Sequence, residues 1–371
     1  MRSLDNNISA FFALVRAGLW EKEVRLSPYM GIDFARVFRL AVEQSVVGLV
    51  AAGLEHVSDV KLPKESVLQF VGETMQLERR NQSMNDFIGV LVEQMGDAGI
   101  YTLIVKGQGI AQCYERPLWR ACGDVDFFLN EENYQKAKSF LIPLSRSVNP
   151  EGGRHLGMTI GTWVVELHGN LHCGLSPQMD RVIDAVQKDV FDGGNVRTWM
   201  NGKTEMFLPS PNNDLILIFT HFLKHFYKGG LGIRQICDWC RLLWTYRDSI
   251  DPGLLTARLR AMRLETAWQA FGAYAVYYLG MPPEAIPLYD ASARWKKKAK
   301  RIQKFILMSG NFGHNRYNGY RNYPFFIRKA FSMGRRIGDL IRHMRIFPLD
   351  SLRYMPSIIL NGVKAAAKGV G

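Results

Sequence analysis

The sequence predicts an α+β protein in which a small mixed β-sheet is flanked by N-terminal and C-terminal helical regions. Residues 1–95 carry apolar side chains at three- and four-residue spacing with few turn signals, a pattern typical of amphipathic helices. From about Gly99 the pattern changes to short, β-branched apolar runs of strand length. From Pro211 the helical spacing returns. These changes, together with the basic composition of the last 81 residues, divide the chain into four expected regions: 1–95, 96–210, 211–290 and 291–371.

The composition is that of a globular protein. The chain has 371 residues, enough for two or three domains, and 47% of them are hydrophobic and 22% charged, which excludes a largely disordered or fibrous chain. Its five cysteines are an odd, scattered set, so no disulfide scaffold is expected. The sequence has no signal-peptide pattern and no run of about 18 apolar residues that could cross a bilayer. We therefore expect a cytoplasmic protein, either free or peripheral at the membrane surface.

The net charge of +13 is unevenly distributed. Residues 291–371 contain 18 lysines and arginines but only two acids, giving +16, whereas the other 290 residues contain 29 bases and 32 acids, giving −3. Within the basic segment, Arg328–Ile346 has the pattern of an amphipathic basic helix. Arginines also alternate there with Tyr317, Tyr320, Tyr323, Phe325 and Phe326. Such a segment can contact an anionic membrane, stack on RNA bases or dock on the protein's own body, and all three remain open.

The strands and helices of the middle region follow from local pattern. In chain order they are strand Tyr101–Val105, helix Gln108–Tyr114, strand Val125–Leu129, helix Glu131–Phe140, the apolar run Leu156–Ile160 and strand Thr162–His168. Ser210-Pro211 and Asp214 then provide a helix start signal. It is followed by helices Leu215–Tyr227 and Ile233–Tyr246, which Gly229-Gly230 separates.

Two aspartates at the start of the second strand are the most informative residues. Asp124 and Asp126 are two positions apart, so their side chains lie on the same face of a strand, and Gly123 before them permits a tight backbone approach. Two carboxylates on one face repel each other unless a cation lies between them. Oxygen ligands suit Mg²⁺, which also retains sites for water and phosphate. The pair therefore predicts a metal site.

Glu166 is the candidate third ligand, and Lys106 the candidate phosphate-binding cation. In the run VVELH, alternation puts Val164, Glu166 and His168 on one face, where a charged group is costly unless it is paired or metal-bound. Lys106-Gly107 lies where the first strand passes into a helix, whose N–H groups and positive dipole end favour phosphate. The set is more typical of a triphosphate-and-metal site than of a protease or an oxidoreductase.

The order Lys106-Gly107, Arg120, Gly123-Asp124-Val125-Asp126 and Glu166-Leu167-His168 resembles the nucleotidyltransferase superfamily of the DNA polymerase β type. Within it, the pattern is similar to a bacterial family of largely uncharacterised nucleotidyltransferases. The resemblance covers about residues 100–170 and extends weakly to 221–239. It departs in one respect, because Gly107-Gln108 precedes Asp124 by 17 residues, farther than the corresponding glycine pair of the wider superfamily.

The resemblance implies a nucleotidyltransferase core in which Asp124, Asp126 and Glu166 bind two Mg²⁺ ions, with Glu166 also a candidate general base. It implies that an NMP group moves from an NTP, with ATP as the expected donor, to a hydroxyl acceptor with release of pyrophosphate. Positioning and electrostatics would supply most of the catalysis. The residues expected to bind the nucleotide are Lys106, Gly107, Gln108, Arg120 and Gly123.

The candidates for a substrate cleft are His168, His221, His225, Arg234 and Asp238. His221 and His225 have the spacing of two helical metal ligands, but HFLKH lacks the glutamate of the zinc-protease pattern, and interface histidines are commoner. Arg234 and Asp238 also have the spacing of a surface ion pair. Cys237 and Cys240 match CxxC within a helical pattern, where two buried thiols are the simpler interpretation.

The sequence thus predicts an Mg²⁺-dependent nucleotidyltransferase whose flanking helices form the acceptor site. The acceptor is open among a small molecule, a protein side chain and an RNA 3′ end. The alternative is a non-catalytic nucleotide-binding module, which would use the pocket as a sensor and the basic C-terminal segment as its contact with membrane or nucleic acid.

Overall fold

A computed structural model describes residues 5–150, 154–313 and 323–367. Four helices precede the first strand: α1 (Asn6–Trp20), α2 (Phe34–Glu43), α3 (Val47–Glu55) and α4 (Lys64–Asp97). Capping side chains fix where two of them begin, because Asp5 accepts a hydrogen bond from the Asn7 amide and Asp33 accepts one from the Arg36 amide. The expected N-terminal helical region is therefore present.

The middle of the chain forms one mixed sheet and the helices between its strands. Its elements are β1 (Leu103–Val105), α5 (Gly107–Ala111), η1 (Pro117–Trp119), β2 (Asp124–Phe128), α6 (Glu131–Leu141), η2 (Ile142–Leu144), β3 (Ser147–Pro150), β4 (His155–Ile160), β5 (Trp163–His168), α7 (Pro177–Phe191), β6 (Val196–Asn201) and β7 (Thr204–Pro209). The strand order is β3-β4-β5-β2-β1-β7-β6. The predicted strands at 101–105, 125–129 and 162–168 appear as β1, β2 and β5, with ends shifted by one or two residues.

Helix α7 and the hairpin β6–β7 have no counterpart among the predicted elements. Every residue of β6 is at least partly exposed, so the alternation that identifies a half-buried strand is weak there. Strand β7 buries Met206 and Leu208 and pairs in parallel with β1, which extends the sheet. Helix α7 does carry start signals, since Ser176 accepts a hydrogen bond from the Met179 amide and Pro177 occupies the first turn.

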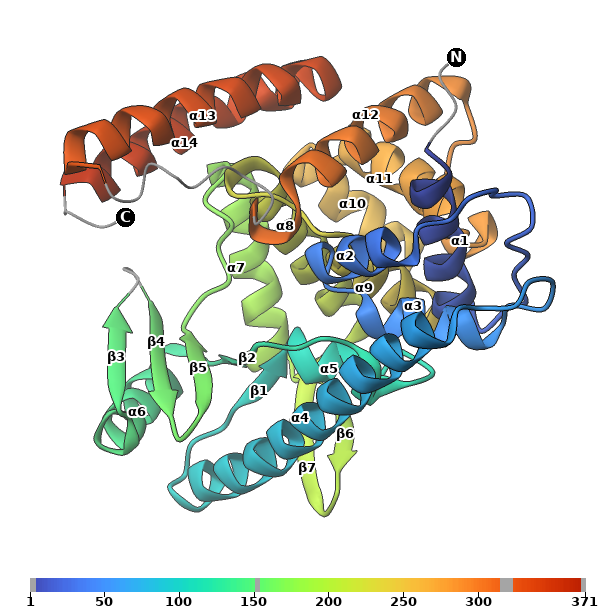
Figure 1. The fold of residues 1–371 in the computed structure, drawn as a ribbon. Coiled ribbons are helices and arrows are strands. Elements are labelled where there is room, and N and C mark those ends of the chain that lie inside the picture. Colours follow the sequence, from blue (N-terminus) through green and yellow to red (C-terminus); the bar gives the residue numbers. More distant parts are fainter. Residues whose placement is uncertain (1–4, 151–153, 314–322, 368–371) are drawn as a thin grey trace.

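Helices make up most of the chain after the sheet. They are α8 (Pro211–Lys228), α9 (Ile233–Thr245), α10 (Pro252–Met262), α11 (Glu265–Leu279), η3 (Pro283–Ala285), α12 (Ala293–Ser309), η4 (Asn311–Gly313), α13 (Phe325–Ile346) and α14 (Pro348–Ala367). Figure 1 shows α13 and α14 side by side at the outer edge of this helical part. Across the described ranges, no helix combines the length and apolarity that crossing a bilayer requires. Tyr317 and Tyr320, expected in the basic segment, lie outside the described residues.

The two faces of the sheet pack against different parts of the chain. Val125 and Phe127 of β2 belong to a core that includes residues of α4 and α6, whereas Phe128 belongs to the larger core formed mainly by the other helices. Because side chains alternate along a strand, Asp124 and Asp126 share the face of Phe128. The two carboxylates therefore face the large helical part of the molecule rather than α4.

The strand register places polar groups from neighbouring strands side by side. Strand β2 runs parallel to β5, and Asp126 lies opposite Glu166. Strand β1 runs antiparallel to β2, and Val105, its last residue, lies opposite Asp126. Strand β4 runs antiparallel to β5, and His155 lies opposite His168. Directly opposite side chains on one face are in contact range, so this register assembles a polar cluster on adjacent strands.

Helices α1 and α3 cross at glycines that leave no room for a side chain. A Cβ atom on Gly53 would lie 2.1 Å from the carbonyl oxygen of Leu14, and one on Gly18 would lie 1.9 Å from the carbonyl oxygen of Leu49. No rotamer change relieves these contacts, because both partners are backbone atoms. Gly53→Val is therefore expected to lower the free energy of unfolding by about 3 kcal/mol, as measured by urea denaturation.

Gly72 on α4 is the matched control for this substitution. A Cβ atom there would meet no heavy atom within 4 Å. Gly72→Ala is expected to leave the free energy of unfolding unchanged or to raise it by up to about 1 kcal/mol, because alanine favours the helix more than glycine does. A Gly53→Val protein as stable as the parent would contradict the close crossing of α1 and α3.

Candidate active site

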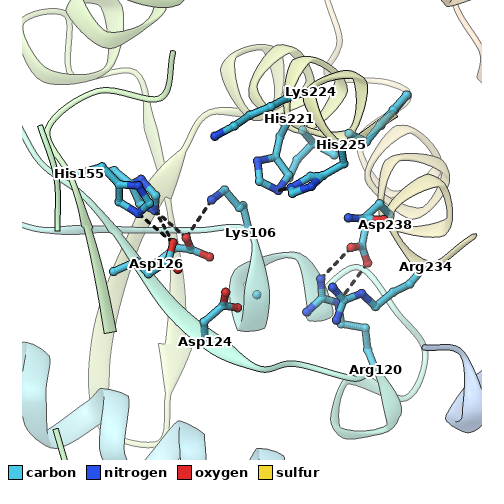
Figure 2. A pocket seen from close by; sticks show the side chains of 16 residues that line it. Lys106, Arg120, Asp124, Asp126, His155, His221, Lys224, His225, Arg234 and Asp238 are labelled. Atoms are coloured by element: carbon cyan, nitrogen blue, oxygen red, sulfur yellow. Dashed lines mark hydrogen bonds and ion pairs between the residues drawn. The ribbon is translucent and has the colours of Figure 1, made fainter. Parts of the chain in front are cut away.

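A cavity of about 210 Å³ lies between the polar cluster of the sheet and helices α8 and α9. Figure 2 shows Asp124 and Asp126 on one side of this cavity and His221 and His225 of α8 on the other. Its walls contain all three predicted metal ligands and all five predicted cleft residues. The predicted residues that line it are Lys106, Gly107, Arg120, Asp124, Asp126, Glu166, His168, His221, His225, Arg234 and Asp238.

Asp126 is the most buried of the three predicted metal ligands. It is 4% exposed, and its Oδ1 accepts hydrogen bonds from Lys106 Nζ at 2.8 Å and from His168 Nε2 at 2.6 Å. Burial disfavours the charged form, but Lys106 and His168 outweigh it and hold the pKa of Asp126 below its usual value. The carboxylate is therefore ionised at neutral pH, with Lys106 as its counter-ion.

Asp124 has the opposite electrostatic environment. The negative charge of Asp126 and then burial raise the pKa of Asp124 to about 6, and Lys106 only partly offsets them. This increase records the repulsion expected for two carboxylates on one face of a strand. The side chain therefore carries a charge at neutral pH that the surrounding residues do not fully balance.

Glu166 is held by two histidines. Its Oε2 lies 3.1 Å from His155 Nε2 and 3.4 Å from His168 Nε2. Burial opposes ionisation, but these contacts and the charge of Lys106 lower the pKa of Glu166 well below its usual value. A carboxylate so strongly stabilised as an anion is a good metal ligand and a poor proton acceptor. The lowered pKa therefore argues against the general-base role of Glu166, and its ligand role stays a prediction.

His155 is a site residue that the sequence pattern did not single out. It comes from β4, and its ring stacks on that of His168 with centroids 4.4 Å apart. The ligand atoms of His155, Glu166 and His168 lie within 4.8 Å of one another, close enough to hold a metal ion. In the described arrangement both rings direct Nε2 at carboxylates, so protons on these nitrogens make them hydrogen-bond donors rather than ligands. We interpret the two rings as supports that orient Glu166 and Asp126.

The Lys106-Gly107 junction has a strained backbone. Lys106 has φ 57°, and Gly107 has φ 35°, both in the region that favours glycine. A Cβ atom on Gly107 would also lie 3.2 Å from Cys122 Sγ, so glycine fits this position for two reasons. Strain of this kind gathers at functional sites, where it aims a side chain. Helix α5 has only five residues, so the ammonium of Lys106, rather than a helix dipole, is the main positive charge here.

Arg120 and Asp238 form a buried ion pair at the far wall of the cavity. Arg120 donates from Nε at 3.0 Å and from Nη2 at 2.7 Å to the two carboxylate oxygens, and Tyr114 donates its hydroxyl to Asp238 at 2.7 Å. Burial opposes the charge of Arg120, but Asp238 raises the pKa of the guanidinium above its usual value. The pair joins η1 to α9, two segments far apart in the chain. Arg120 therefore reaches the cavity while bound to Asp238.

The spacing of Arg234 and Asp238 suggested a helix-surface ion pair, but the two side chains do not form one. Arg234 Nη1 instead donates to the carbonyl oxygen of Ala121 at 2.6 Å. This bond joins α9 to the loop before β2, and the carboxylate oxygens of Asp238 bond Arg120 and Tyr114 instead. Burial and then the charge of Arg120 lower the pKa of Arg234 from its usual value.

Helix α8 contributes the wall opposite the carboxylates. Nε2 of His221 and Nε2 of His225 are 3.0 Å apart. Burial lowers the pKa of His225 to about 3 and that of His221 well below its usual value, with nearby cations adding to the effect. Both rings are therefore neutral at physiological pH. Lys224 of the same helix also lines the cavity and had no sequence signal beyond its charge.

Two of the predicted nucleotide-binding residues lie away from the cavity wall. The Gln108 side chain is buried and donates to Asn81 Oδ1 of α4 at 3.0 Å, so it joins the short helix α5 to α4. Gly123 does not line the cavity, and a Cβ atom there would meet no heavy atom within 4 Å. Close packing within the protein therefore does not require glycine at this position.

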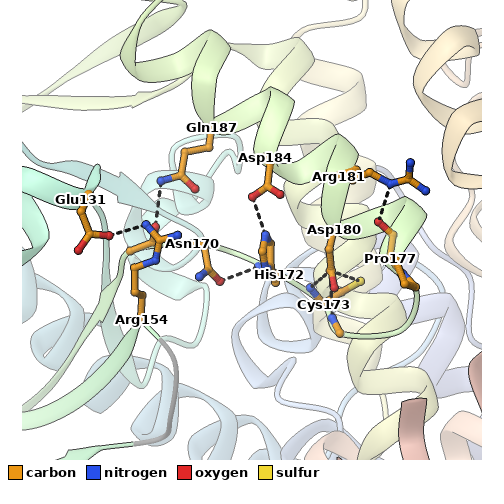
Figure 3. A network of polar contacts seen from close by, with 12 residues as sticks. Glu131, Arg154, Asn170, His172, Cys173, Pro177, Asp180, Arg181, Asp184 and Gln187 are labelled. Atoms are coloured by element: carbon orange, nitrogen blue, oxygen red, sulfur yellow. Dashed lines mark hydrogen bonds and ion pairs between the residues drawn. The ribbon is translucent and has the colours of Figure 1, made fainter. Parts of the chain in front are cut away.

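A second cavity of about 360 Å³ adjoins the first and shares Lys106, His155, His168, His221 and Lys224 with it. Polar contacts fix its other wall (Figure 3): His172 bonds Asp184 of α7 at 2.6 Å, and Arg154 pairs with Glu131 of α6. Asn170 and Cys173 also line it. The site therefore consists of two adjoining cavities that have Lys106 in their shared wall.

Cys237 and Cys240 are two buried thiols, which is the simpler interpretation of their CxxC spacing. Both are fully buried free thiols on α9, among the aromatic side chains of the large core. Burial raises the pKa of each thiol far above its usual value, so neither is a thiolate at neutral pH.

A family model described as "Uncharacterised nucleotidyltransferase" matches residues 31–280, about two thirds of the chain. No curated protein and no solved structure matches it. The matched range contains the whole sheet and both helices that line the cavity. The protein therefore belongs to this family of uncharacterised nucleotidyltransferases, which makes it a transferase whose family implies a nucleotide substrate.

Proposed function

We propose that the protein is an Mg²⁺-dependent nucleotidyltransferase. It moves an NMP group from an NTP to a hydroxyl acceptor and releases pyrophosphate, and ATP is the expected donor. The observation that carries the proposal is the register that sets Asp126 opposite Glu166, with Asp124 on the same strand face and Lys106 bonded to Asp126. This is the arrangement expected of a metal-and-triphosphate site of the DNA polymerase β type.

The charges of the site fit a divalent cation. Asp124, Asp126 and Glu166 face one cavity, and the raised pKa of Asp124 shows that the negative charge there is only partly balanced. Oxygen donors of this kind suit Mg²⁺. These three carboxylates would hold the two Mg²⁺ ions. When bound, the ions would supply positive charge to the transferring phosphoryl group and to the attacking and leaving oxygens.

Other residues of the chain have separate roles in the proposal. Lys106 lies between the two cavities and neutralises charge on the departing pyrophosphate. His155 and His168 orient Glu166 and Asp126. The neutral rings of His221 and His225 form a wall of the nucleotide cavity and add no charge to it. We assign the nucleotide to the cavity that contains Asp124 and the acceptor to the adjoining one, because the reacting hydroxyl must reach the carboxylates from beside the triphosphate.

The test is transfer of label from an NTP carrying a labelled α-phosphate. The purified chain is incubated with Mg²⁺ and each NTP in turn, with fractionated cell extract as the source of acceptor, and pyrophosphate is measured in parallel. Labelled acceptor with matching pyrophosphate is the expected result. Calorimetry with a non-hydrolysable NTP separates the alternative, because binding without label transfer or pyrophosphate release would support the non-catalytic sensor instead.

The supporting role of His155 gives a further expectation. His155→Gln removes the ring stacked on His168 and loosens Glu166, so kcat is expected to fall about tenfold or more and the Mg²⁺ concentration needed for half-maximal rate to rise. His56→Gln is the matched control, because His56 also bonds a glutamate, Glu21 at 2.7 Å, but does not line either cavity. Equal rates and Mg²⁺ requirements in the parent and the His155 variant would rule out this role.

A further inference from the structure

Helices α13 and α14, which we call the C-terminal hairpin, expose an unusual amount of apolar surface. Ten of the 26 large apolar side chains that are exposed among the described residues lie within residues 323–360. On α13 they include Met333, Ile337 and Ile341, which are four residues apart and form one stripe. On α14, Leu349, Leu352 and Ile359 form a second stripe. Each helix therefore turns an apolar side toward solvent.

The side of the hairpin that packs on the protein is partly polar. On α13 the buried residues include Asp339 and His343, and the ring of His343 lies 4.6 Å from that of Phe226 on α8. On α14 they include Asp350 and Tyr354. Surface helices normally bury their apolar stripe. The exposed stripes are therefore available to something outside the chain.

The charge of the hairpin is arranged for an anionic partner. The sequence of α13 contains six lysines and arginines and one acid, Asp339. The two acids of residues 291–371, Asp339 and Asp350, are buried and paired with Arg342 at 3.2 Å and Arg353 at 3.3 Å. No acid of the described hairpin is therefore exposed beside the apolar stripes.

We propose that the C-terminal hairpin docks on the surface of a membrane containing anionic lipid. The exposed isoleucine, leucine and methionine side chains enter the boundary between headgroups and acyl chains, and the lysines and arginines contact headgroup phosphates. An apolar face combined with basic residues is the physical requirement for a helix that lies in the plane of the interface. The proposal does not depend on nucleotidyl transfer.

Three other occupants match the surface less well. RNA would use the cations and stack on aromatic rings, but eight of the ten exposed apolar side chains are aliphatic or methionine. A second copy of the chain would bring one +16 segment against another, and such like-charge contacts are unfavourable. The protein's own body already packs on the opposite side, through His343 and Tyr354.

The test is co-sedimentation of the full chain with vesicles of phosphatidylcholine alone or with one-third phosphatidylglycerol. Ile337→Gln/Ile341→Gln is the main variant, and Leu352→Gln/Ile359→Gln tests the second stripe. Val71→Gln/Met75→Gln is the matched control, because it changes two exposed apolar residues with the same spacing on α4. All replaced side chains are half exposed, so the fold is expected to survive, and thermal unfolding checks this.

The parent is expected to bind the anionic vesicles at least about tenfold more tightly than the neutral ones, and less tightly as salt is raised. Each hairpin variant should lose about tenfold in affinity, while the α4 control and Asp124→Asn/Asp126→Asn should bind like the parent. Equal binding to both vesicles, equal loss in the control or no vesicle binding would overturn the proposal. If vesicle binding is absent, two other results would reassign the surface. A dimer seen by light scattering that the hairpin variants abolish would assign it to a second copy of the chain. An RNA complex seen by filter binding that the same variants abolish would assign it to RNA.

Discussion

Asp124→Asn/Asp126→Asn is expected to lower kcat/KM for NMP transfer by about 10³-fold or more and to leave the protein folded. Asparagine keeps the shape of both side chains but removes the two charges that would hold the metal and align the phosphates. The effect should appear mainly in kcat, because Lys106 would still attract the triphosphate. Rates measured with saturating Mg²⁺ and NTP against the parent provide the test, and a variant with near-parent kcat would remove the proposed function.

The single variant Asp124→Asn should at the same time stabilise the metal-free protein. In the folded chain the pKa of Asp124 is raised to about 6, whereas its ordinary value in an unfolded chain is about 3.9. The folded state therefore holds the proton longer, so stability falls as pH rises from about 4 to 6 and the full destabilisation remains above pH 6. Asparagine removes this repulsion, and a gain of about 1–3 kcal/mol is expected above pH 6.

Urea denaturation in the presence of a chelator measures this gain. The difference between Asp124→Asn and the parent should be largest at about pH 8 and vanish below about pH 4. Asp97→Asn, at an exposed position near the end of α4, is the control and should change nothing. A variant that is inactive and also less stable than the parent at pH 8 would indicate a folding defect, and the loss of activity would then carry no information on metal binding.

Asp238→Ala is expected to lower the free energy of unfolding by about 3–5 kcal/mol. The substitution leaves the Arg120 guanidinium buried without its carboxylate and removes the acceptor of the Tyr114 hydroxyl. Breaking one side of a buried pair is much more harmful than removing both sides. Arg120→Met/Asp238→Leu should therefore recover most of the lost stability.

The double variant also separates structure from nucleotide binding. If Arg120 contacts the nucleotide in addition to Asp238, the double variant will be stable but show a raised KM for NTP with a smaller change in kcat. Unfolding and steady-state kinetics of the three proteins complete the measurement. Glu132→Ala is the exposed control, since the Lys136–Glu132 pair lies in solvent and is expected to contribute little. A stable Asp238→Ala protein would contradict the structural role of the pair.

The grouping of the three predicted metal ligands could be expected from local pattern. Asp124, Asp126 and Glu166 were found because period two fixes which residues share a strand face, and the structure places all three in one cavity. The sequence did not predict His155 as a site residue, because its position beside His168 depends on the pairing of β4 with β5. Register of that kind follows from turn geometry and packing, which a single stretch of sequence does not display.

The long-range contacts were the least predictable. Spacing on a helix suggested that Asp238 pairs with Arg234, whereas its partner Arg120 is 118 residues away in the chain. Such a pair forms only once α9 has packed over the loop before β2. Long-range contacts also explain the hairpin β6–β7. Its residues have a weak strand pattern, but β7 pairs with the edge of β1 and β6 pairs with β7. Local propensity is overridden there by tertiary contacts.

The bond between Lys106 and Asp126 has a consequence for the order in which the protein is assembled. Because the ammonium of Lys106 already pairs with the buried Asp126 carboxylate, the chain is expected to fold without a metal, unlike small domains that are unfolded until they bind one. Under the proposed function, newly made protein would complete its sheet first and bind Mg²⁺ afterwards. A chelator is then expected to abolish the activity of the folded protein without unfolding it.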